Sequence, residues 1–239
     1  MQGTSLKDEF KKIWSKPLQR KVIIWIAAFL MASVAVTIRS AETKADLCDH
    51  LDDIIVTVDD EEICLQELSY YIMICEAKIN AVAEVYDETD TMAFWNIYTN
   101  QTFIRTQAKE AAMNTCVRDC IYSHEADEAG VSLDEDELKE VETYVTECVE
   151  GLSYKQKNAT QFDEESLTPV IERVYLARKY ANMLLESEDF SDYNDTPNVS
   201  VDIGGQYYTE LYESHEVVIN EKLWKKISLG NITIEKVKV

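Results

Sequence analysis

Residues 54–71 read IIVTVDDEEICLQELSYY and form the start of a folded domain. The β-branched run Ile54–Val58 predicts a short strand, and the acidic residues Asp59–Glu62 predict a turn after it. A helix should begin at Leu65, because apolar residues then recur at three- and four-residue steps for about six turns. These residues are Leu65, Leu68, Ile72, Cys75, Ile79, Val82 and Tyr86. The stretch therefore predicts a strand that leads directly into a long amphipathic helix.

Two more helices are predicted downstream. The first begins somewhere in Thr91–Gln101 and runs to about Glu128, and Gly130 supplies the left-handed residue that ends it. The second begins with a capping box, because Glu135 follows Ser132 by three residues, and it continues to residue 151. Only 6 Gly and 3 Pro in 239 residues argue against an all-β fold with many tight turns.

A third helix should close the helical body. Its apolar pattern runs from Phe162 to near Glu186, and Pro169 predicts either a kink or a fresh start capped by Thr168. Beyond it we expect a strand at Val199–Ile203, a helix at Gln206–His215, a strand at Val217–Ile219 and a helical turn at Glu221–Ile227. The predicted fold is mainly α, with a short N-terminal strand and a small C-terminal α/β appendage.

The N-terminal region carries the opposite charge to the rest of the chain. The net charge is −22, yet residues 1–21 carry +4, which leaves −26 for the remainder. The uncharged run Val22–Ile38 is at the short end of what spans a bilayer, and the basic leader predicts a cytoplasmic N-terminus. We expect a transmembrane anchor at 22–38, with a juxtamembrane linker at 39–53. A signal peptide cleaved at Ser33-Val34-Ala35 is the alternative. Both place the main domain outside the cytoplasm.

The acidic charge also excludes a class of partner, because nucleic acid phosphates would be repelled. The acidic runs 59–62 and 134–137 are expected to be solvated faces or helix caps, not calcium sites. Six cysteines are compatible with disulfides in an oxidising compartment, although Cys75 and Cys148 are expected to be small buried hydrophobes. No histidine stands at metal-ligand spacing from a cysteine, so neither a metal nor another cofactor is predicted.

No catalytic residue is predicted either. His50 and His124 are expected to be solvated, one in the linker and one near a helix end. Ser214, His215 and Glu216 are adjacent in sequence, but a nucleophile and its base usually come from separate elements of a fold.

Three motifs occur in an order that is typical of one family. The first comprises Ile55, Val56, Val58, Asp59, Asp60, Glu61, Ile63, Glu67, Leu68, Tyr70 and Tyr71. The second is EADEAGVSLDEDEL, residues 125–138, and the third is LTPVIERVYLARKYANMLLE, residues 167–186. Together they resemble the N-terminal helical chaperone domain of the SurA-type and PrsA-type extracytoplasmic foldases. The resemblance covers 54–186, and residues 187–239 would complete that domain.

The chain also departs from this family. A parvulin-type prolyl isomerase domain usually follows the long helix, but residues 187–205 cannot hold one, and its Arg-His-Ile-Leu opening is absent. The resemblance therefore implies a membrane-anchored holdase that binds unfolded or newly exported polypeptides. A relative of the peptidyl-prolyl isomerases and a dedicated interaction subunit of a cell-envelope assembly are the alternatives. A homodimer formed by helix exchange is compatible with such a fold.

Aromatic side chains are the expected contacts for such polypeptides, because they are amphipathic and lose little entropy on binding. The chain has 13 Tyr and 4 Trp. The candidate peptide-binding residues are Tyr70, Tyr71, Phe94, Trp95 and Tyr98. Of the neighbouring aromatic residues, we expect Trp95 to be exposed and Phe103 to belong to the core.

Overall fold

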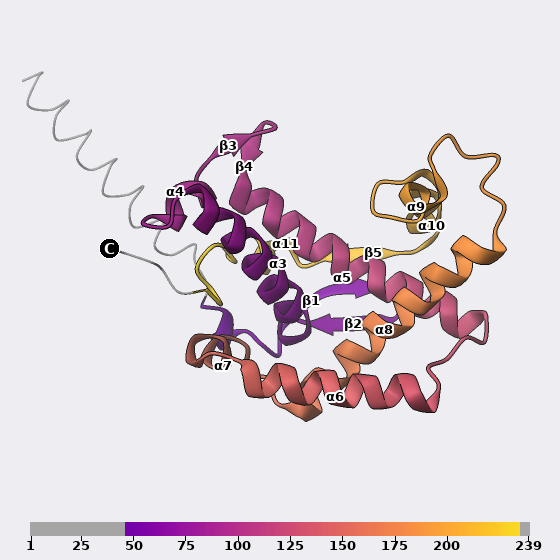
Figure 1. Cartoon of the computed structure of the whole chain (residues 1–239), viewed down its shortest axis with the longest axis horizontal. Coiled ribbons are helices and arrows are strands. Elements are labelled where there is room, and N and C mark those ends of the chain that lie inside the picture. The colour runs from indigo at the N-terminus through magenta and orange to yellow at the C-terminus, as the bar shows by residue number, and fades with distance from the viewer. Residues whose placement is uncertain (1–45, 235–239) are drawn as a thin grey trace, which may run out of the picture. The chain divides into compact units, whose positions relative to one another are not determined.

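The computed structural model describes residues 46–234 (Figure 1). Contacts divide the chain between Lys44 and Ala45, and the described residues belong to the second unit. This unit is mainly helical with a small sheet, which confirms the predicted fold class at that level. The predicted leader, the apolar segment 22–38 and the first part of the linker lie outside the described residues. Within 46–234, no helix combines the length and the apolar character that crossing a membrane requires.

The main sheet joins the beginning of the domain to its end. Strands β1 (Ile54–Val58), β2 (Glu61–Cys64) and β5 (Val217–Ile219) are antiparallel and lie in the order β2-β1-β5. Val58 pairs with Glu61 on one side and with Val217 on the other. Asp59 begins the turn after β1 with a left-handed backbone, φ 51°, which the short polar Asp tolerates better than a β-branched residue does.

Four long helices form most of the domain: α3 (Leu65–Tyr86), α5 (Ile104–Glu128), α6 (Glu135–Gly151) and α8 (Glu164–Ser187). Helix α5 packs against α3 and against α8, while α6 packs against α8. Strand β1 also contacts α5, and its side chains Ile55, Val56 and Val58 are fully buried. Figure 1 shows the sheet beside α5, between α3 and α8.

Short elements connect the long helices. They are η1 (Leu47–Asp49), α4 (Thr91–Trp95), β3 (Tyr98–Thr99), β4 (Thr102–Phe103), α7 (Tyr154–Thr160), α9 (Pro197–Ser200), α10 (Gln206–Ser214) and α11 (Glu221–Trp224). Strands β3 and β4 form a two-stranded hairpin of their own. Helices α10 and α11 and strand β5 fall within the predicted C-terminal elements.

Two helix starts differ from the prediction. The segment 91–101 does not run into α5, because Asn100 and Gln101 adopt positive φ values of 49° and 67° and turn the chain into the hairpin. Helix α6 is capped by Asp134, not by Ser132. The Asp134 carboxylate accepts from the backbone N–H groups of residues 136 and 137, and the Glu137 carboxylate accepts from the Asp134 N–H at 2.8 Å. Gly130 has the predicted left-handed backbone, φ 69°.

In the second half, Thr168 does not cap a new helix, and the predicted strand at 199–203 is absent. Helix α8 runs through Pro169 without a new start, and its cap is Asp163, which accepts from the Ser166 N–H at 2.8 Å. The Thr168 hydroxyl instead donates to the Glu164 carbonyl at 2.6 Å. Residues 199–203 do not form a strand, because Pro197 occupies the first position of α9 and fixes a helical φ there.

The last described residues are fixed to α3 by a buried carboxylate. Glu76 is fully buried, and its two oxygens accept four hydrogen bonds of 2.6–3.1 Å from the C-terminal segment. The donors are the N–H groups of Gly230, Ile232 and Thr233 and the Thr233 hydroxyl. Gly230, with φ 108°, lies on the ring of Trp95, so closely that an added Cβ would be 3.1 Å from it.

All six cysteines lie within the described residues, and all carry free thiols. Cys116 and Cys120 are fully buried in α5. Cys75 and Cys148 are partly buried and pack against the core, and the Cys75 thiol donates to the Ala108 carbonyl at 3.3 Å.

Candidate peptide-binding groove

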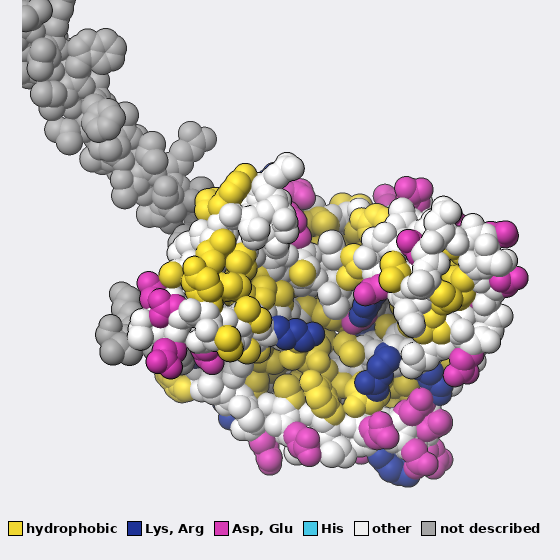
Figure 2. All heavy atoms as spheres, turned by 45° about the horizontal axis from the view of Figure 1, so that its top comes forward, with side chains coloured by type: hydrophobic (Ala, Val, Ile, Leu, Met, Phe, Trp, Pro, Cys, Tyr) yellow, Lys and Arg dark blue, Asp and Glu magenta, His cyan; other side chains and the backbone are white. Residues whose placement is uncertain are grey.

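A groove crosses α5 between α3 and α8, and we call it the central groove. It consists of two cavities of about 340 and 320 Å³, which share Arg118, Asp119 and Val174. Figure 2 shows hydrophobic side chains lining a hollow on this face, with Lys and Arg side chains in and around it. The apolar lining includes Tyr70, Tyr71, Ile74, Ala111, Ala112, Tyr122, Ala177, Ala181 and Leu185.

Small side chains explain why this face is hollow. Ala177 and Ala181 are four residues apart and therefore share one face of α8, while Ala111 and Ala112 lie on α5. Methyl groups at these positions fill less space between the helices than larger side chains would. Tyr122 bounds the second cavity, and its hydroxyl donates to the Val201 carbonyl at 2.5 Å, ahead of α10.

An ion pair between a buried carboxylate and a partly buried guanidinium lies at the junction of the two cavities. The Asp119 carboxylate accepts from Arg118 Nη2 at 2.8 Å, and Arg118 Nη1 lies 3.2 Å from Asp202. Burial raises the pKa of the Asp119 carboxyl, against the opposing effect of Arg118. Burial alone would lower the pKa of Arg118, but the two carboxylates outweigh it and raise that pKa. The apolar groove thus contains a fixed polar group whose charges are already paired.

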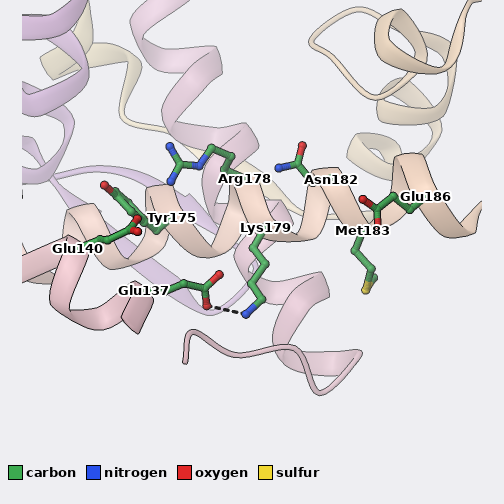
Figure 3. A pocket seen from close by; sticks show the side chains of 8 residues that line it. All are labelled: Glu137, Glu140, Tyr175, Arg178, Lys179, Asn182, Met183 and Glu186. Carbon is green, nitrogen blue, oxygen red and sulfur yellow. Dashed lines mark hydrogen bonds and ion pairs between the residues drawn. The ribbon is translucent and has the colours of Figure 1, made fainter. Parts of the chain in front are cut away.

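A third cavity, of about 400 Å³, lies between α6 and α8 and shares Arg178 and Asn182 with the central groove (Figure 3). Lys179 pairs with Glu137 at 2.6 Å. Figure 3 shows Arg178 and Lys179 extending to opposite sides of α8. The Arg178 guanidinium lies over the Tyr175 ring, 4.3 Å from its centroid. The lining therefore continues from α3 to α6.

Two cations of this lining are free of ion pairs. Within residues 46–234, the ion pairs of Lys and Arg involve neither Lys78 nor Arg178, and both side chains belong to exposed residues. The chain as a whole has a net charge of −22. Lys78 and Arg178 thus give the groove a local charge opposite to that of the protein.

The predicted peptide-binding residues separate into two places. Tyr70 and Tyr71 line the central groove, although both are largely buried. Their rings pack edge to face at 5.4 Å, and the Tyr70 hydroxyl lies 3.2 Å from that of Tyr144. Phe94 and Tyr98 belong to α4 and the hairpin and are not part of the groove lining.

The expectations for Trp95 and Phe103 were both wrong. Trp95 is fully buried, with 0% exposure, because the C-terminal segment covers it at Gly230. Phe103 is 45% exposed, since the hairpin carries it away from the core to pack on Tyr98 at 5.2 Å. Sequence reasoning also missed the alanines that line the groove. Their helical spacing indicates an apolar helix face, but a face packed in the core and a face that lines a groove show the same spacing.

Outside the groove, one cluster among the described residues suits a metal ion: Asp59, His124 and His215. His124 is partly buried between two carboxylates, contrary to the expectation that it would be solvated. Its hydrogen bond to Glu61 raises the pKa of His124, and the hydrogen bond from His215 lowers the pKa of Asp59. The Ser214 hydroxyl donates to the Leu211 carbonyl at 2.6 Å.

Comparison of the chain with protein-family models, curated proteins and solved structures finds no match. The geometry and chemistry of the grooved face therefore carry the functional argument.

Proposed function

We propose that the chain is a membrane-anchored extracytoplasmic chaperone of SurA-like helical fold, which holds unfolded or newly exported polypeptides in the central groove without isomerising their prolines. The observation that supports this most directly is the apolar groove across α3, α5 and α8, continuous with a pocket on α6 (Figure 2). Segment 22–38 would hold the domain at the membrane.

The lining suits clients that share no sequence. Removing apolar surface from water is favourable by roughly 25 cal/mol per Å² whatever its sequence, so a groove of alanine, valine and tyrosine accepts apolar side chains from unrelated sequences. Its polar groups Arg118 and Asp119 are already paired and require no particular partner from the client. The net charge of −22 would keep a protein with such a surface soluble.

A dedicated interaction subunit is the second candidate, and the same groove supports it. Such a subunit would bind one segment of a single partner in the groove, whereas a chaperone would bind segments of many different polypeptides there. The breadth of clients therefore separates the two functions.

The test is suppression of aggregation by a fragment of residues 45–239, which corresponds to the second unit of the chain. Two unrelated unfolding substrates and a proline-limited refolding reaction would be followed in parallel. A holdase should suppress both aggregates at near-stoichiometric amounts and leave the proline step unchanged. Acceleration of the proline step would contradict the proposed mechanism, and no suppression of either substrate would favour the dedicated subunit.

A pair of valine substitutions ties the activity to the groove. Val174 borders both cavities, so Val174→Asn places an amide at their junction. Val218, on β5, is 55% exposed and lines none of the three cavities, so Val218→Asn is the matched control. We expect the first substitution to raise the amount of protein needed for suppression several-fold and the second to leave it unchanged. Equal effects would place client binding elsewhere. Circular dichroism would establish that both variants are folded.

A further inference from the structure

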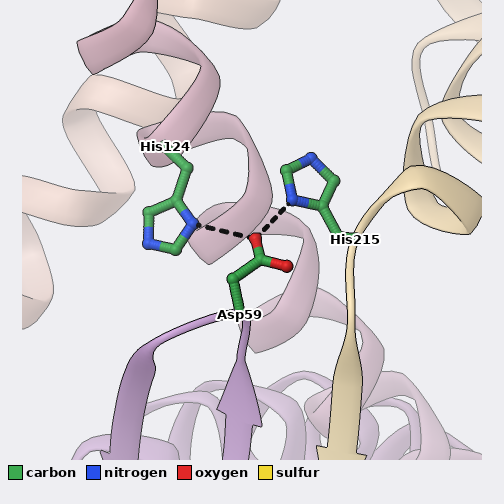
Figure 4. Close-up of side chains that lie close together, drawn as sticks. All are labelled: Asp59, His124 and His215. Atoms are coloured by element: carbon green, nitrogen blue, oxygen red, sulfur yellow. Dashed lines mark hydrogen bonds and ion pairs between the residues drawn. The ribbon is translucent and has the colours of Figure 1, made fainter.

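Three segments that are distant in sequence bring two imidazoles to one carboxylate (Figure 4). Asp59 lies in the turn after β1, His124 in the last part of α5, and His215 directly after α10. Asp59 Oδ2 is 2.6 Å from His215 Nδ1 and 3.5 Å from His124 Nδ1. One ligand atom from each of the three residues lies within 4.8 Å of those of the other two.

The far nitrogen of each imidazole faces a second carboxylate. His124 Nε2 lies 2.8 Å from Glu61, and His215 Nε2 lies 3.3 Å from Glu125. His215 Nε2 is buried and makes no hydrogen bond within residues 46–234. At His124, the Glu61 carboxylate keeps the proton on Nε2 and leaves the Nδ1 lone pair directed at the shared point. Histidines that bind metals are oriented in this way.

The carboxylates on both sides are themselves fixed. Glu61 pairs with the Arg173 guanidinium at 2.6 Å. Asp59 Oδ1 accepts from the Glu216 N–H at 2.8 Å, and the Asp59 N–H donates to the Glu216 carbonyl at the same distance. The register of β1 with β5 therefore sets the position of Asp59 relative to His215. The three ligands need little reorganisation to converge on an ion.

The charges of the cluster suit a divalent cation. The carboxylates of Asp59, Glu61 and Glu125 lie within 3.5 Å of the ring nitrogens of the two histidines. A metal ion binds neutral imidazoles and an ionised carboxylate.

We propose that Asp59, His124 and His215 form a binding site for a divalent transition metal of the Zn²⁺ class. Two imidazoles and one carboxylate favour Zn²⁺ or Co²⁺ over Mg²⁺ and Ca²⁺, which prefer oxygen ligands. Tetrahedral bonds of about 2.0–2.1 Å place neighbouring ligand atoms about 3.3 Å apart. The Asp59–His124 distance already fits this value, and the Asp59–His215 contact must open by about 0.7 Å.

The exposures of the ligands indicate where solvent reaches the ion. The His215 side chain is 10% exposed, that of His124 29% and that of Asp59 37%. Three protein ligands and one open side leave the fourth position to water. The metal would join the β1–β2 turn, the end of α5 and the start of β5, so it would fasten the C-terminal strand to the sheet. This inference does not depend on the proposed chaperone function.

The test uses the full-length chain in non-ionic detergent after removal of metals with a chelator. Zn²⁺ is titrated by calorimetry at pH 6 and pH 8 in buffers of different ionisation enthalpy, which gives the number of protons released. We expect one ion per chain and tighter binding at pH 8 than at pH 6, because metal ligands bind in their deprotonated forms. Because six free thiols also bind zinc, Co²⁺ spectra are recorded as well, and the site should give no thiolate charge-transfer band.

Substitutions locate the ion. His124→Gln and His215→Gln should each weaken Zn²⁺ binding by at least about tenfold, as should Asp59→Asn, which keeps the shape of the turn residue. His50→Gln is the control, because His50 pairs with Asp53 at 2.6 Å outside the cluster. Undetectable binding, a thiolate band or unchanged affinity in Asp59→Asn would each overturn the proposal. If a histidine variant does not fold, the Zn²⁺ affinity of Asp59→Asn alone tests the proposal.

Discussion

Glu76, in the middle of α3, holds Thr233 through both its backbone and its side chain. One carboxylate oxygen accepts from the Thr233 N–H at 2.6 Å and from its hydroxyl at 2.7 Å. Because Glu76 is fully buried, water cannot replace it as the acceptor for these donors. The folded state of the first long helix and the position of the last described residues therefore depend on each other.

Replacement of this carboxylate should destabilise the domain strongly. Glu76→Gln puts an amide N–H₂ against buried donors, and we expect a loss of about 2–3 kcal/mol in the free energy of unfolding. Urea unfolding measures it. Glu84→Gln, at an exposed position of the same helix, should change that free energy by less than about 0.5 kcal/mol. Equal losses in the two variants would show that the hydrogen bonds between Glu76 and the C-terminal segment do not stabilise the fold.

Gly230 and Gly204 separate a backbone effect from a packing effect. Both have positive φ, 108° and 85°, so an alanine is strained at either position. Only Gly230 has a neighbour near the added Cβ, the Trp95 ring at 3.1–3.3 Å, whereas Gly204 has nothing within 4 Å. Gly230→Ala should therefore lower the melting temperature further than Gly204→Ala does. A larger effect at Gly204 would contradict the packing of the C-terminal segment on Trp95.

The His124–Glu61 pair predicts a pH-dependent part of the stability. The pKa of His124 is raised in the folded state, first by its hydrogen bond to Glu61. The folded state thus binds the proton more tightly than the unfolded chain does. The stabilisation that this proton gives is fully present below the pKa of histidine in the unfolded chain, about 6.5. It is lost as the pH rises through the higher pKa of His124 in the folded state.

Unfolding of the wild type and of His124→Gln at pH 5.5, 6.5 and 8.5, in the presence of a chelator, measures this contribution. The difference in free energy of unfolding should be largest at the two lower values and should shrink at pH 8.5. A difference that grows with pH would contradict the assignment.

Two arginines of α8 should differ sharply in their effect on stability. Arg173 is largely buried and pairs with Glu61 at 2.6 Å and with Glu67 at 2.9 Å, whereas Arg178 is exposed. Arg173→Met leaves two partly buried carboxylates without a counter-charge, and we expect a loss of about 3 kcal/mol or more in the free energy of unfolding. Arg178→Met should cost less than about 1 kcal/mol. Chemical denaturation of both variants tests the contrast, and similar costs would contradict the structural role of Arg173.

If the groove binds polypeptides, its free cations should set a charge preference. Lys78 and Arg178 belong to the lining of adjoining cavities, and neither has an ion-pair partner among the described residues. The double variant Lys78→Gln/Arg178→Gln should weaken binding of an apolar peptide with acidic flanks more than binding of the same peptide with basic flanks, by a few-fold at low salt. Fluorescence anisotropy measures both affinities, and an equal change for the two peptides would contradict this view of the groove.

Local sequence patterns predicted the elements more reliably than their packing. Helix α3 begins and ends at Leu65 and Tyr86, as the apolar spacing indicated, because that pattern is a property of the segment itself. The burial of Trp95 was not predictable in this way, since it depends on Gly230, which arrives from the far end of the chain. The cap of α6 was misplaced by two residues, because Asp134–Glu137 and Ser132–Glu135 both match a capping box and only the backbone decides between them.

The cluster of Asp59, His124 and His215 was even less predictable from local sequence patterns. Asp59 and His215 are 156 residues apart, and no spacing rule connects them. They meet because β5 pairs with β1, and that pairing depends on the whole helical body between the two strands. The strand Val217–Ile219 was predicted, but its partner was not.

The pairing of β1 with β5 has a consequence for how the protein is made. A ribosome or an export channel delivers the chain from the N-terminus, so β1, β2 and the long helices emerge before residues 217–219 do. Until then one edge of β1 lacks its partner, and Glu76 has no donors from the C-terminal segment. An exposed strand edge is a site for pairing with other chains. The nascent protein should therefore be vulnerable to misassociation until residues 217–219 have emerged and paired with β1.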